Sequence, residues 1–416
     1  MLAILTTHPI QYQVPVWKEL AASGNIPFKV FYMSNQGLKA RFDPGFGKWL
    51  SWDIDLLAGY ECEFLDTYRG PRFDSFWSLR LKRGFGRALG RMGAEALLIL
   101  GWQVVAYWQA VFEARKQGIE VWVRGETNAR SNAGGTGRQF KRRLLRQLLG
   151  RVDRLLYIGE ANRQFYLEQG IDNERLAPAP YCVDNARFAA AAAAVRPERH
   201  RIREEWGIPA EAFCFLFAGK FLAKKRPFDL IEATRLLQHA FQGKKIHLLW
   251  VGTGELGAKL RQACHTCFDA ERCERVNASS GPNGPNASFV GFLNQSEISQ
   301  AYVAADCLVL PSDAQETWGL VVNEAMASGL PCIVSKACGC VEDLIAPIRP
   351  DLCYSAGDIS ALEQAMAAAV TNAPPSQLLR AHISKYDVSR TIDTVESLYL
   401  KKSRPNQITF AQRVIP

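Results

Sequence analysis

The chain of 416 residues lacks an apolar segment long enough to cross a membrane. Its longest uncharged, apolar-rich run, residues 96–112, contains Gly101, Gln103 and Gln109, so we expect a strand followed by a helix rather than a membrane span. The opening Met-Leu-Ala-Ile-Leu carries no basic residue before its apolar run, so no secretory signal peptide is expected. These absences predict a soluble, cytoplasmic protein.

The sequence also lacks the motifs of P-loop nucleotide sites and has little that suggests a metal site. No Gly-x4-Gly-Lys-Ser/Thr motif occurs, which argues against a P-loop nucleotide hydrolase. The eleven cysteines are scattered, mostly within apolar runs, as is typical of reduced thiols rather than of a disulfide framework. Cys264, Cys267 and Cys273 with His265 have a spacing that zinc could use, but no second Cys-x-x-C pair follows. We therefore predict no metal site.

Composition is that of a globular enzyme with an anionic partner. Apolar residues make up 48% of the chain and charged residues 22%, and the length allows two domains. The net charge of +9 favours a negatively charged partner. Of the possible partners we expect a nucleotide and an anionic lipid surface, and no nucleic acid.

Short apolar runs alternate with helical patterns in both halves of the chain, which predicts parallel βαβ units. The alanine run 189–194 and the charged stretch after it interrupt this alternation, which resumes at Phe213. The predicted fold class is α/β, with two Rossmann-like, doubly wound domains that face one another across a cleft. We place the first domain at 1–185, a linker at 186–212 and the second domain at 213–385. A C-terminal helix and tail, 386–416, are expected to pack back toward the first domain.

One stretch of the second half predicts strand, loop, helix, loop and strand. Cys307–Leu310 suits a buried strand, a helical pattern follows from Leu320, and Gly329 lies where a helix C-cap is expected. Glu316 precedes this helix, and Glu324 lies about two turns along it. Carboxylates at the carboxyl ends of strands can accept hydrogen bonds from sugar and ribose hydroxyls. The alternative is an amphipathic helix with two solvated acids.

Two glycine-containing turns suit phosphate groups. Gly219-Lys220 follows one predicted strand and Lys225 comes just before a helix, so ammonium groups and a helix N-terminus lie close together. Gly252-Thr-Gly254 follows the next strand and opens another helix. A single Gly-x-Gly is weak support, but both turns and the two acids fall at strand ends of one domain. The set predicts a site for a nucleoside diphosphate.

These motifs occur in a recognisable order. Glu316-x7-Glu324 has Leu310-Pro-Ser before it and Gly329-Leu-Pro after it, and it is preceded by Ala218-Gly-Lys220, Lys225, Val251-Gly-Thr-Gly254 and Phe289-Val-Gly-Phe292. This order resembles the GT-B glycosyltransferases of family 4, closely over 213–334 and more loosely in His8-Pro-Ile-Gln-Tyr12 and Ile158-Gly-Glu160. The resemblance implies a retaining transferase that uses a UDP- or GDP-sugar, without metal or cofactor, in polysaccharide, lipopolysaccharide or glycolipid synthesis.

The resemblance also implies residue roles. Glu316, Lys220 and Lys225 would be catalytic, with Glu316 on the donor sugar and the lysines on the diphosphate, while Glu324 would bind the ribose. The remaining donor-binding residues would be Gly219, Gly252, Gly254, Gly291, Phe292, Thr317, Trp318, Gly319 and Leu320. Lys220 stands where the family more often has arginine, which keeps the charge but loses the bidentate fork.

The acceptor is expected to be a glycan or a lipid-linked glycan that enters from the first half. His8, Gln11, Arg124 and Glu126 follow strands there, and each could orient or deprotonate an acceptor hydroxyl or simply pack its loop. Asp53-Ile-Asp55 imitates a metal-binding Asp-x-Asp, which we discount. Two other functions stay open: a GT-B nucleotide-sugar epimerase, and a non-catalytic partner in a glycan assembly complex.

A basic amphipathic helix is predicted at residues 138–154. Arg142, Arg143 and Arg146 are among its basic residues, and leucines recur at helical spacing. Such a helix suits anionic lipid headgroups, which would place the protein at the inner face of the cell membrane. The alternative is an ordinary helix with a solvated basic face.

Overall fold

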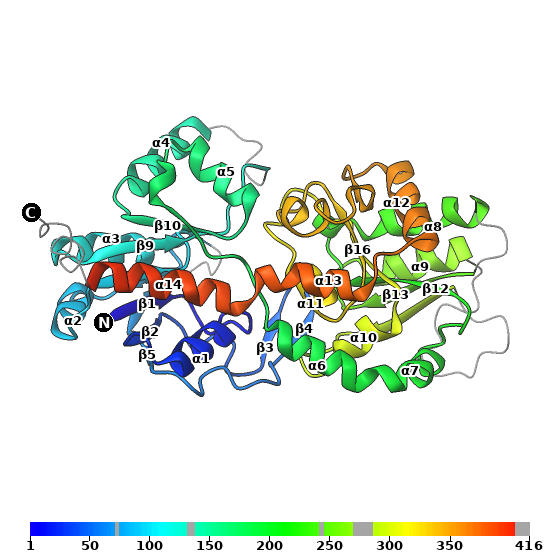
Figure 1. Ribbon diagram of the computed structural model, residues 1–416, viewed down its shortest axis with the longest axis horizontal. Coiled ribbons are helices and arrows are strands. Elements are labelled where there is room, and N and C mark those ends of the chain that lie inside the picture. Colours follow the sequence, from blue (N-terminus) through cyan, green and yellow to red (C-terminus); the bar gives the residue numbers. More distant parts are fainter. Residues whose placement is uncertain (71–74, 131–137, 241–244, 269–285, 404–416) are drawn as a thin grey trace, which may run out of the picture.

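The structure, a computed structural model, describes residues 1–70, 75–130, 138–240, 245–268 and 286–403. Within these ranges the chain forms two separate parallel sheets, which lie in two lobes (Figure 1). Each sheet is built from apolar strands with helices on both faces, as the alternation in the sequence predicts.

The first sheet has seven parallel strands in the order β11-β10-β9-β8-β1-β2-β5. Its strands are β1 (Leu2–Thr6), β2 (Phe28–Tyr32), β5 (Cys62–Phe64), β8 (Ala96–Ile99), β9 (Glu120–Arg124), β10 (Arg154–Tyr157) and β11 (Leu176–Pro178). The helices are α1 (Val14–Ser23), α2 (Phe85–Arg91), α3 (Val105–Lys116), α4 (Arg138–Leu149) and α5 (Glu160–Glu168). Alternate residues of β1 face two different clusters, with Leu2 and Ile4 on one side and Ala3 and Leu5 on the other.

The second sheet has six parallel strands in the order β14-β13-β12-β15-β16-β17. They are β12 (Phe213–Ala218), β13 (Ile246–Val251), β14 (Ala287–Gly291), β15 (Cys307–Leu310), β16 (Cys332–Ser335) and β17 (Cys353–Tyr354). The helices α8 (Pro227–Ala240), α9 (Gly257–Phe268) and α12 (Ile359–Thr371) lie apart from α10 (Ser299–Ala304), α11 (Leu320–Ala327) and α13 (Ser376–Ile383) (Figure 1).

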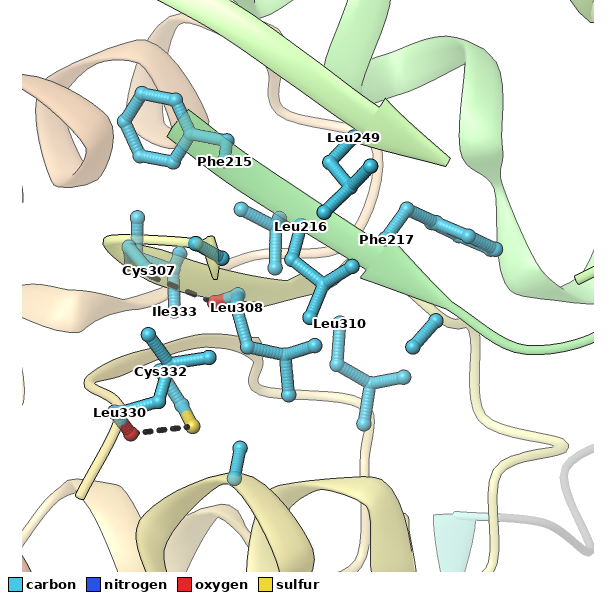
Figure 2. Packing of buried hydrophobic residues seen from close by; sticks show 14 of the residues in the cluster. Phe215, Leu216, Phe217, Leu249, Cys307, Leu308, Leu310, Leu330, Cys332 and Ile333 are labelled. Carbon is cyan, nitrogen blue, oxygen red and sulfur yellow. Dashed lines mark hydrogen bonds between the residues drawn. The ribbon is translucent and has the colours of Figure 1, made fainter. Parts of the chain in front are cut away.

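The core of this second sheet is formed by side chains of its central strands. Figure 2 shows Phe215, Leu216 and Phe217 of β12 beside residues of β15 and β16. The buried thiols of Cys307 and Cys332 donate to backbone carbonyls at 3.5 Å. All cysteines whose side chains are described are free thiols, in agreement with the prediction from the sequence.

The stretch 186–212, predicted as a linker, is largely helical. It contains most of α6 (Asn185–Val195) and all of α7 (Arg199–Glu205), because alanine favours helix and the Asp184 carboxylate caps α6 by accepting from Arg187 N. Phe188 of α6 is fully buried in the core of the second sheet. A composition shift therefore marks a packed helix pair here, and the domain boundaries themselves stay predictions.

The last helix, α14 (Val388–Ser403), lies on the first sheet (Figure 1). Val388, Ile392, Val395 and Tyr399 belong to the same cluster as Leu2 of β1. None of the described helices is long and apolar enough to cross a bilayer.

The basic helix is shorter than predicted. It ends at Leu149 rather than Arg154, because Gly150 follows and Asp153 already bonds to Val121 of β9 through its backbone N–H. Arg154 belongs to β10 instead. The side chains of Arg138 and Lys141 lie outside what the structure describes.

The loop-rich stretch after β2 also contains regular structure. β3 (Arg41–Asp43) and β4 (Lys48–Leu50) pair as an antiparallel hairpin, and β6 (Thr67–Arg69) pairs with β7 (Leu79–Leu81). We call residues 41–53 the hairpin segment. It extends from the first half to the loops of the second.

Asp343 joins the two halves away from these loops. Its carboxylate accepts from the backbone N of Glu160, at the start of α5, at 3.0 Å. Burial raises the pKa of Asp343 to about 6, although the bonds from Glu160 and Tyr386 act in the opposite direction. The native protein therefore binds this proton more tightly than the unfolded chain does.

We predict that this carboxylate makes stability fall as the pH rises. Because the folded pKa is the higher one, the free energy of unfolding should decrease by about 2 kcal/mol between pH 4.5 and 6.5. Asp343→Asn cannot titrate and should lack this decrease. Urea unfolding of both proteins at the two pH values measures it, and parallel pH profiles would show that Asp343 is not the source.

Candidate active site

The cleft lies at the point of the second sheet where the strand order reverses. β12 pairs with β13 on one side and with β15 on the other, so the loops after β12 and β15 leave the sheet in opposite directions. In open parallel sheets such a point leaves a crevice at the carboxyl ends of the strands. The loop after β12 carries Lys220, and the loop after β15 carries Glu316. The first sheet has a similar point between β1 and β8.

A cavity of about 330 Å³ lies at this crevice, and both halves of the chain line it. From the first half come Tyr12, Phe46, Trp52, Glu126 and Tyr181. From the second come Ala218, Gly219, Lys220, Lys225, Val251, Gly252, Phe292, Leu293, Gln295, Ile298, Tyr302, Glu316, Thr317, Trp318, Gly319, Leu320, Val321 and Glu324. All three residues predicted to be catalytic therefore meet in one cavity.

Lys225 and Glu316 form an ion pair inside the cavity. Their side chains are 18% and 16% exposed, so the pair is largely shielded from water. The hydroxyl of Ser312 also donates to Glu316, at 3.2 Å. The pair fixes the loop after β15 against the short helical turn Ala223–Lys225 that precedes α8.

Glu324 lies deeper in the cavity wall, on α11. It is 3% exposed, and burial raises the pKa of its carboxyl group. Tyr302 donates its hydroxyl hydrogen to Oε2, whereas Oε1 has no hydrogen bond of normal geometry within the described residues. Tyr12 and Gln295 lie close enough to this carboxyl group to lower its pKa, against the larger effect of burial. An unpaired buried oxygen is costly, so this atom suits a hydroxyl donor from a ligand.

The predicted glycine turns bring backbone segments close together. Gly252 has a φ of +129°, and a Cβ there would lie 1.9 Å from the carbonyl oxygen of Gly219. Gly254 has a φ of +156° and similarly lies against Gly45 of the hairpin segment. Gly254 and Gly291, predicted to bind the donor, do not line the cavity, although the carbonyl of Gly291 accepts from the backbone N–H of the lining residue Gly252 at 2.6 Å.

Lys220 has a partner that the sequence did not predict. Its Nζ lies 2.9 Å from Oδ2 of Asp43, at the end of β3 in the first half. The same ammonium lies 4.8 Å from the centre of the Phe46 ring. In this structure the charge expected to meet a diphosphate is thus paired with an acid from the opposite side of the cleft.

The residues that follow Glu316 line the cavity and also hold the loop in place. The carbonyl of Thr317 accepts from Asn128 of the first half at 3.1 Å. The indole N–H of Trp318 donates to Asn323 at 2.8 Å, and the side chain is 2% exposed. Trp318 therefore fixes the loop, while Gly319 and Leu320 begin the helix beside the cavity.

The four residues predicted on the acceptor side have different positions in the structure, and one of them lines the cavity. Glu126 lines the cavity and accepts from the Tyr181 hydroxyl at 2.6 Å. Arg124 donates to the carbonyls of Ala179 and Pro180, so its guanidinium holds a loop. His8 and Gln11 do not line the cavity.

His8 lies in the loop after β1. Its Nδ1 is 2.9 Å from the Thr7 hydroxyl. Burial and the neighbouring Arg41 charge lower the pKa of His8 to about 4, so the ring is neutral at pH 7. A ring with so low a pKa is a weak proton acceptor at pH 7, and the acceptor-side role of His8 stays a prediction.

The candidate metal ligands do not gather in the described part of the chain, where no group of three or more His, Cys, Asp or Glu side chains is arranged for an ion. Cys273 and the side chain of Cys267 lie outside the described residues. Asp53 accepts from Ser296 N at 3.0 Å, and Asp55 accepts from Leu57 N and Ala58 N.

Several cavity residues were not predicted as site residues. They are Tyr12, Phe46, Trp52, Tyr181, Ala218, Val251, Leu293, Gln295, Ile298, Tyr302 and Val321. Asp43, the partner of Lys220, was not predicted either. Phe42-Asp-Pro-Gly-Phe-Gly stood out in the sequence as dense in glycine, proline and aromatic residues, which was the available signal. It gave no indication that this hairpin reaches the second half.

Comparison with known proteins finds a family match within the second half of the chain. Residues 198–387, which are 190 of the 416, match the model of a family described as glycosyl transferases group 1. The carboxy-terminal half thus carries the features of that family. The match covers Lys220, Lys225, Glu316 and Glu324 and supports a group 1 glycosyltransferase.

Individual relatives agree with this class. The D-inositol 3-phosphate glycosyltransferase 1 of Catenulispora acidiphila is 28% identical over 210 residues, which cover 49% of this chain and 47% of that protein. The GDP-mannose-dependent alpha-mannosyltransferase of Mycobacterium tuberculosis is 28% identical over 288 residues, 68% of this chain and 64% of that protein. The chain spans less than two thirds of either relative.

A solved structure confirms the fold. Anabaena Alr3699/HepE in complex with UDP and glucose superposes with a TM-score of 0.62, over 96% of this chain and 99% of that chain, at 14% identity. The two facing Rossmann-like domains are therefore a GT-B fold, as predicted.

The pairing of Lys220 with Asp43 predicts competition with phosphate. Asp43→Asn should strengthen inorganic pyrophosphate binding up to about fivefold, because a partly exposed ion pair contributes at most about 1 kcal/mol. Isothermal titration calorimetry measures the affinity. Asp66→Asn, which removes an acid paired with Lys82, is the matched control and should have no effect. Weaker pyrophosphate binding by Asp43→Asn would show that Asp43 supports the site rather than competing for it.

Proposed function

We propose that the chain is a retaining glycosyltransferase that moves a sugar from a UDP- or GDP-sugar to a hydroxyl acceptor. One observation carries the proposal: two lysines, one acid in an ion pair and one buried acid with an unpaired oxygen surround a single cavity at the point where the second sheet reverses direction. Each group suits one part of a nucleotide sugar. The family match of the second half and the transferases among its relatives support the same class.

The lysines would bind the diphosphate. As the bond from the anomeric carbon to the phosphate oxygen breaks, negative charge grows on the departing diphosphate. Lys220 and Lys225 would stabilise this charge more strongly in the transition state than in the ground state, which lowers the barrier. Because two ammonium groups supply this compensation, the proposal needs no metal ion or cofactor.

The acids would bind hydroxyls at the two ends of the donor. Glu316 would accept from the sugar once a phosphate takes its place on Lys225. Glu324 would accept from the ribose through Oε1, the atom that has no partner among the described residues. Both roles use charge-assisted hydrogen bonds in a shielded site, where such bonds are strong.

The acceptor would approach from the first half, where Glu126 lines the cavity. Its carboxylate could take a proton from an acceptor hydroxyl, and the bond from Tyr181 holds it in place. The acceptor class we propose is a glycan or lipid-linked glycan of a polysaccharide, lipopolysaccharide or glycolipid. No protein nucleophile is assigned.

We predict that Lys225→Ala and Glu316→Ala each reduce turnover at least about a hundredfold, because groups that stabilise transition-state charge contribute effects of this size. Release of UDP or GDP from nucleotide sugars, with and without candidate acceptors, measures turnover. Lys224→Ala, the neighbouring lysine outside the cavity lining, is the control and should be near wild type.

Other outcomes of the same assay would favour other functions. Near-wild-type turnover by either cavity variant would refute the site. A product formed without any acceptor would favour the epimerase, and no binding of any nucleotide sugar would favour a non-catalytic partner.

Peripheral contact with an anionic membrane through α4 is a separate proposal. Arg142 and Arg146 already donate to the carbonyls of Glu168 and Gln169, so part of the predicted basic face holds α5. Arg143 is exposed and makes no such bond within the described structure.

We expect Arg143→Glu to weaken sedimentation with vesicles that contain phosphatidylserine by roughly thirtyfold, since a surface cation contributes about 1 kcal/mol and reversal of its charge removes about twice that. Arg87→Glu on α2 is the control for net charge. Equal sedimentation of both variants and the wild type would leave α4 a solvated helix.

A further inference from the structure

The hairpin segment, residues 41–53, crosses the cleft and contacts the loops of the second half. The Thr253 hydroxyl donates to the carbonyl of Phe46 at 2.7 Å. The Asn294 amide donates to the carbonyl of Ser51 at 2.8 Å, and Ser296 N donates to Asp53 at 3.0 Å. These bonds hold the turn of the hairpin segment and the residues that follow β4, so this part of the segment is fixed against the loops of the second half.

Two aromatic side chains of the hairpin segment line the cavity. Phe46 lies edge-on to Phe292, with ring centres 5.0 Å apart, and Trp52 lies 6.4 Å from the same ring. All three residues line the cavity. Trp49, in the same hairpin, is 69% exposed and does not line it. The cavity thus has an aromatic wall made of Phe46, Trp52 and Phe292.

This aromatic wall lies at the end of the cavity away from Glu316. Phe292 follows β14, while Glu316 follows β15, and the strand order between them is β14-β13-β12-β15. Three strand spacings of about 4.8 Å each amount to roughly 14 Å. The lysine that follows β12 comes between the two ends. A nucleotide sugar with its diphosphate at Lys220 and its sugar at Glu316 therefore directs its base toward the aromatic wall.

We propose that Phe46 and Trp52, contributed by the first half, form with Phe292 the surface on which the donor's nucleobase stacks. The inference rests on the proposed function and adds to it that the acceptor-side half builds part of the donor site. Every base has a flat π face, and aromatic side chains bind such faces well. The ligand class is a nucleoside diphosphate, in contrast to a sugar or a bare phosphate.

The test compares ligands with and without a base. We expect Trp52→Leu to weaken UDP or GDP binding about tenfold, since stacking on one aromatic residue contributes about 1–3 kcal/mol. Pyrophosphate has no base, so its affinity should not change. Trp52→Phe keeps a ring and should bind within about twofold of wild type. Trp49→Leu, the exposed tryptophan, is the matched control and should not differ from wild type. Calorimetry measures each affinity.

Two results would overturn the inference. Equal losses for the nucleotide and for pyrophosphate would mean that Trp52 acts through the hairpin's contact with Lys220, and unchanged nucleotide binding would mean that the base lies elsewhere. If Trp52→Leu fails to fold by circular dichroism, Phe46→Leu is measured against the same ligands with the same criteria. A wild-type protein that binds no nucleoside diphosphate would instead refute the proposed function.

Discussion

The reversal of strand order in the second sheet is the constraint on which the site depends. β12 is the first strand of that sheet in the sequence and lies near its centre, with β13 on one side and β15 on the other. The loops that follow β12 and β15 then separate and leave space between them. Residues 96 positions apart, Lys220 and Glu316, come to one cavity for this reason. The helices on both faces stabilise the sheet, so the loops between strands and helices can carry the residues of the site.

The unliganded site keeps its charges paired across that space. Lys225 is paired with Glu316, and Lys220 with Asp43, so neither ammonium is left without an opposite charge in a partly dry cavity. Of the buried side-chain atoms without a hydrogen-bond partner in the described structure, the one that belongs to a cavity-lining residue is Oε1 of Glu324. A ligand with two phosphates and several hydroxyls would replace these internal ion pairs with its own contacts. Breaking the pairs costs free energy, which limits the net affinity. The site therefore favours ligands that provide partners for both lysines and both acids at once.

The sequence predicted what depends on local pattern. Buried parallel strands are continuous apolar runs, so Cys307–Leu310 and the helix from Leu320 were placed correctly, and the motifs of the second half lie at strand ends. Contacts between distant segments were not predictable. Asp43 and Lys220 are 177 residues apart, and nothing in either local stretch shows that they meet. The packing of segment 186–212 was not predictable either, because a change in composition does not reveal whether the helices there are packed.

The position of α14 makes the first lobe discontinuous in sequence. Val388, Ile392 and Val395 cover the same face of the first sheet as Leu2 and Ile4, although the whole second lobe intervenes. A chain cut after residue 185 would leave that face bare to water, so the amino-terminal lobe cannot be complete until the last helix has been synthesised. The polypeptide passes between the lobes near Val183 and again near Asp387, and a parallel β-bridge between these two residues holds the two crossings side by side.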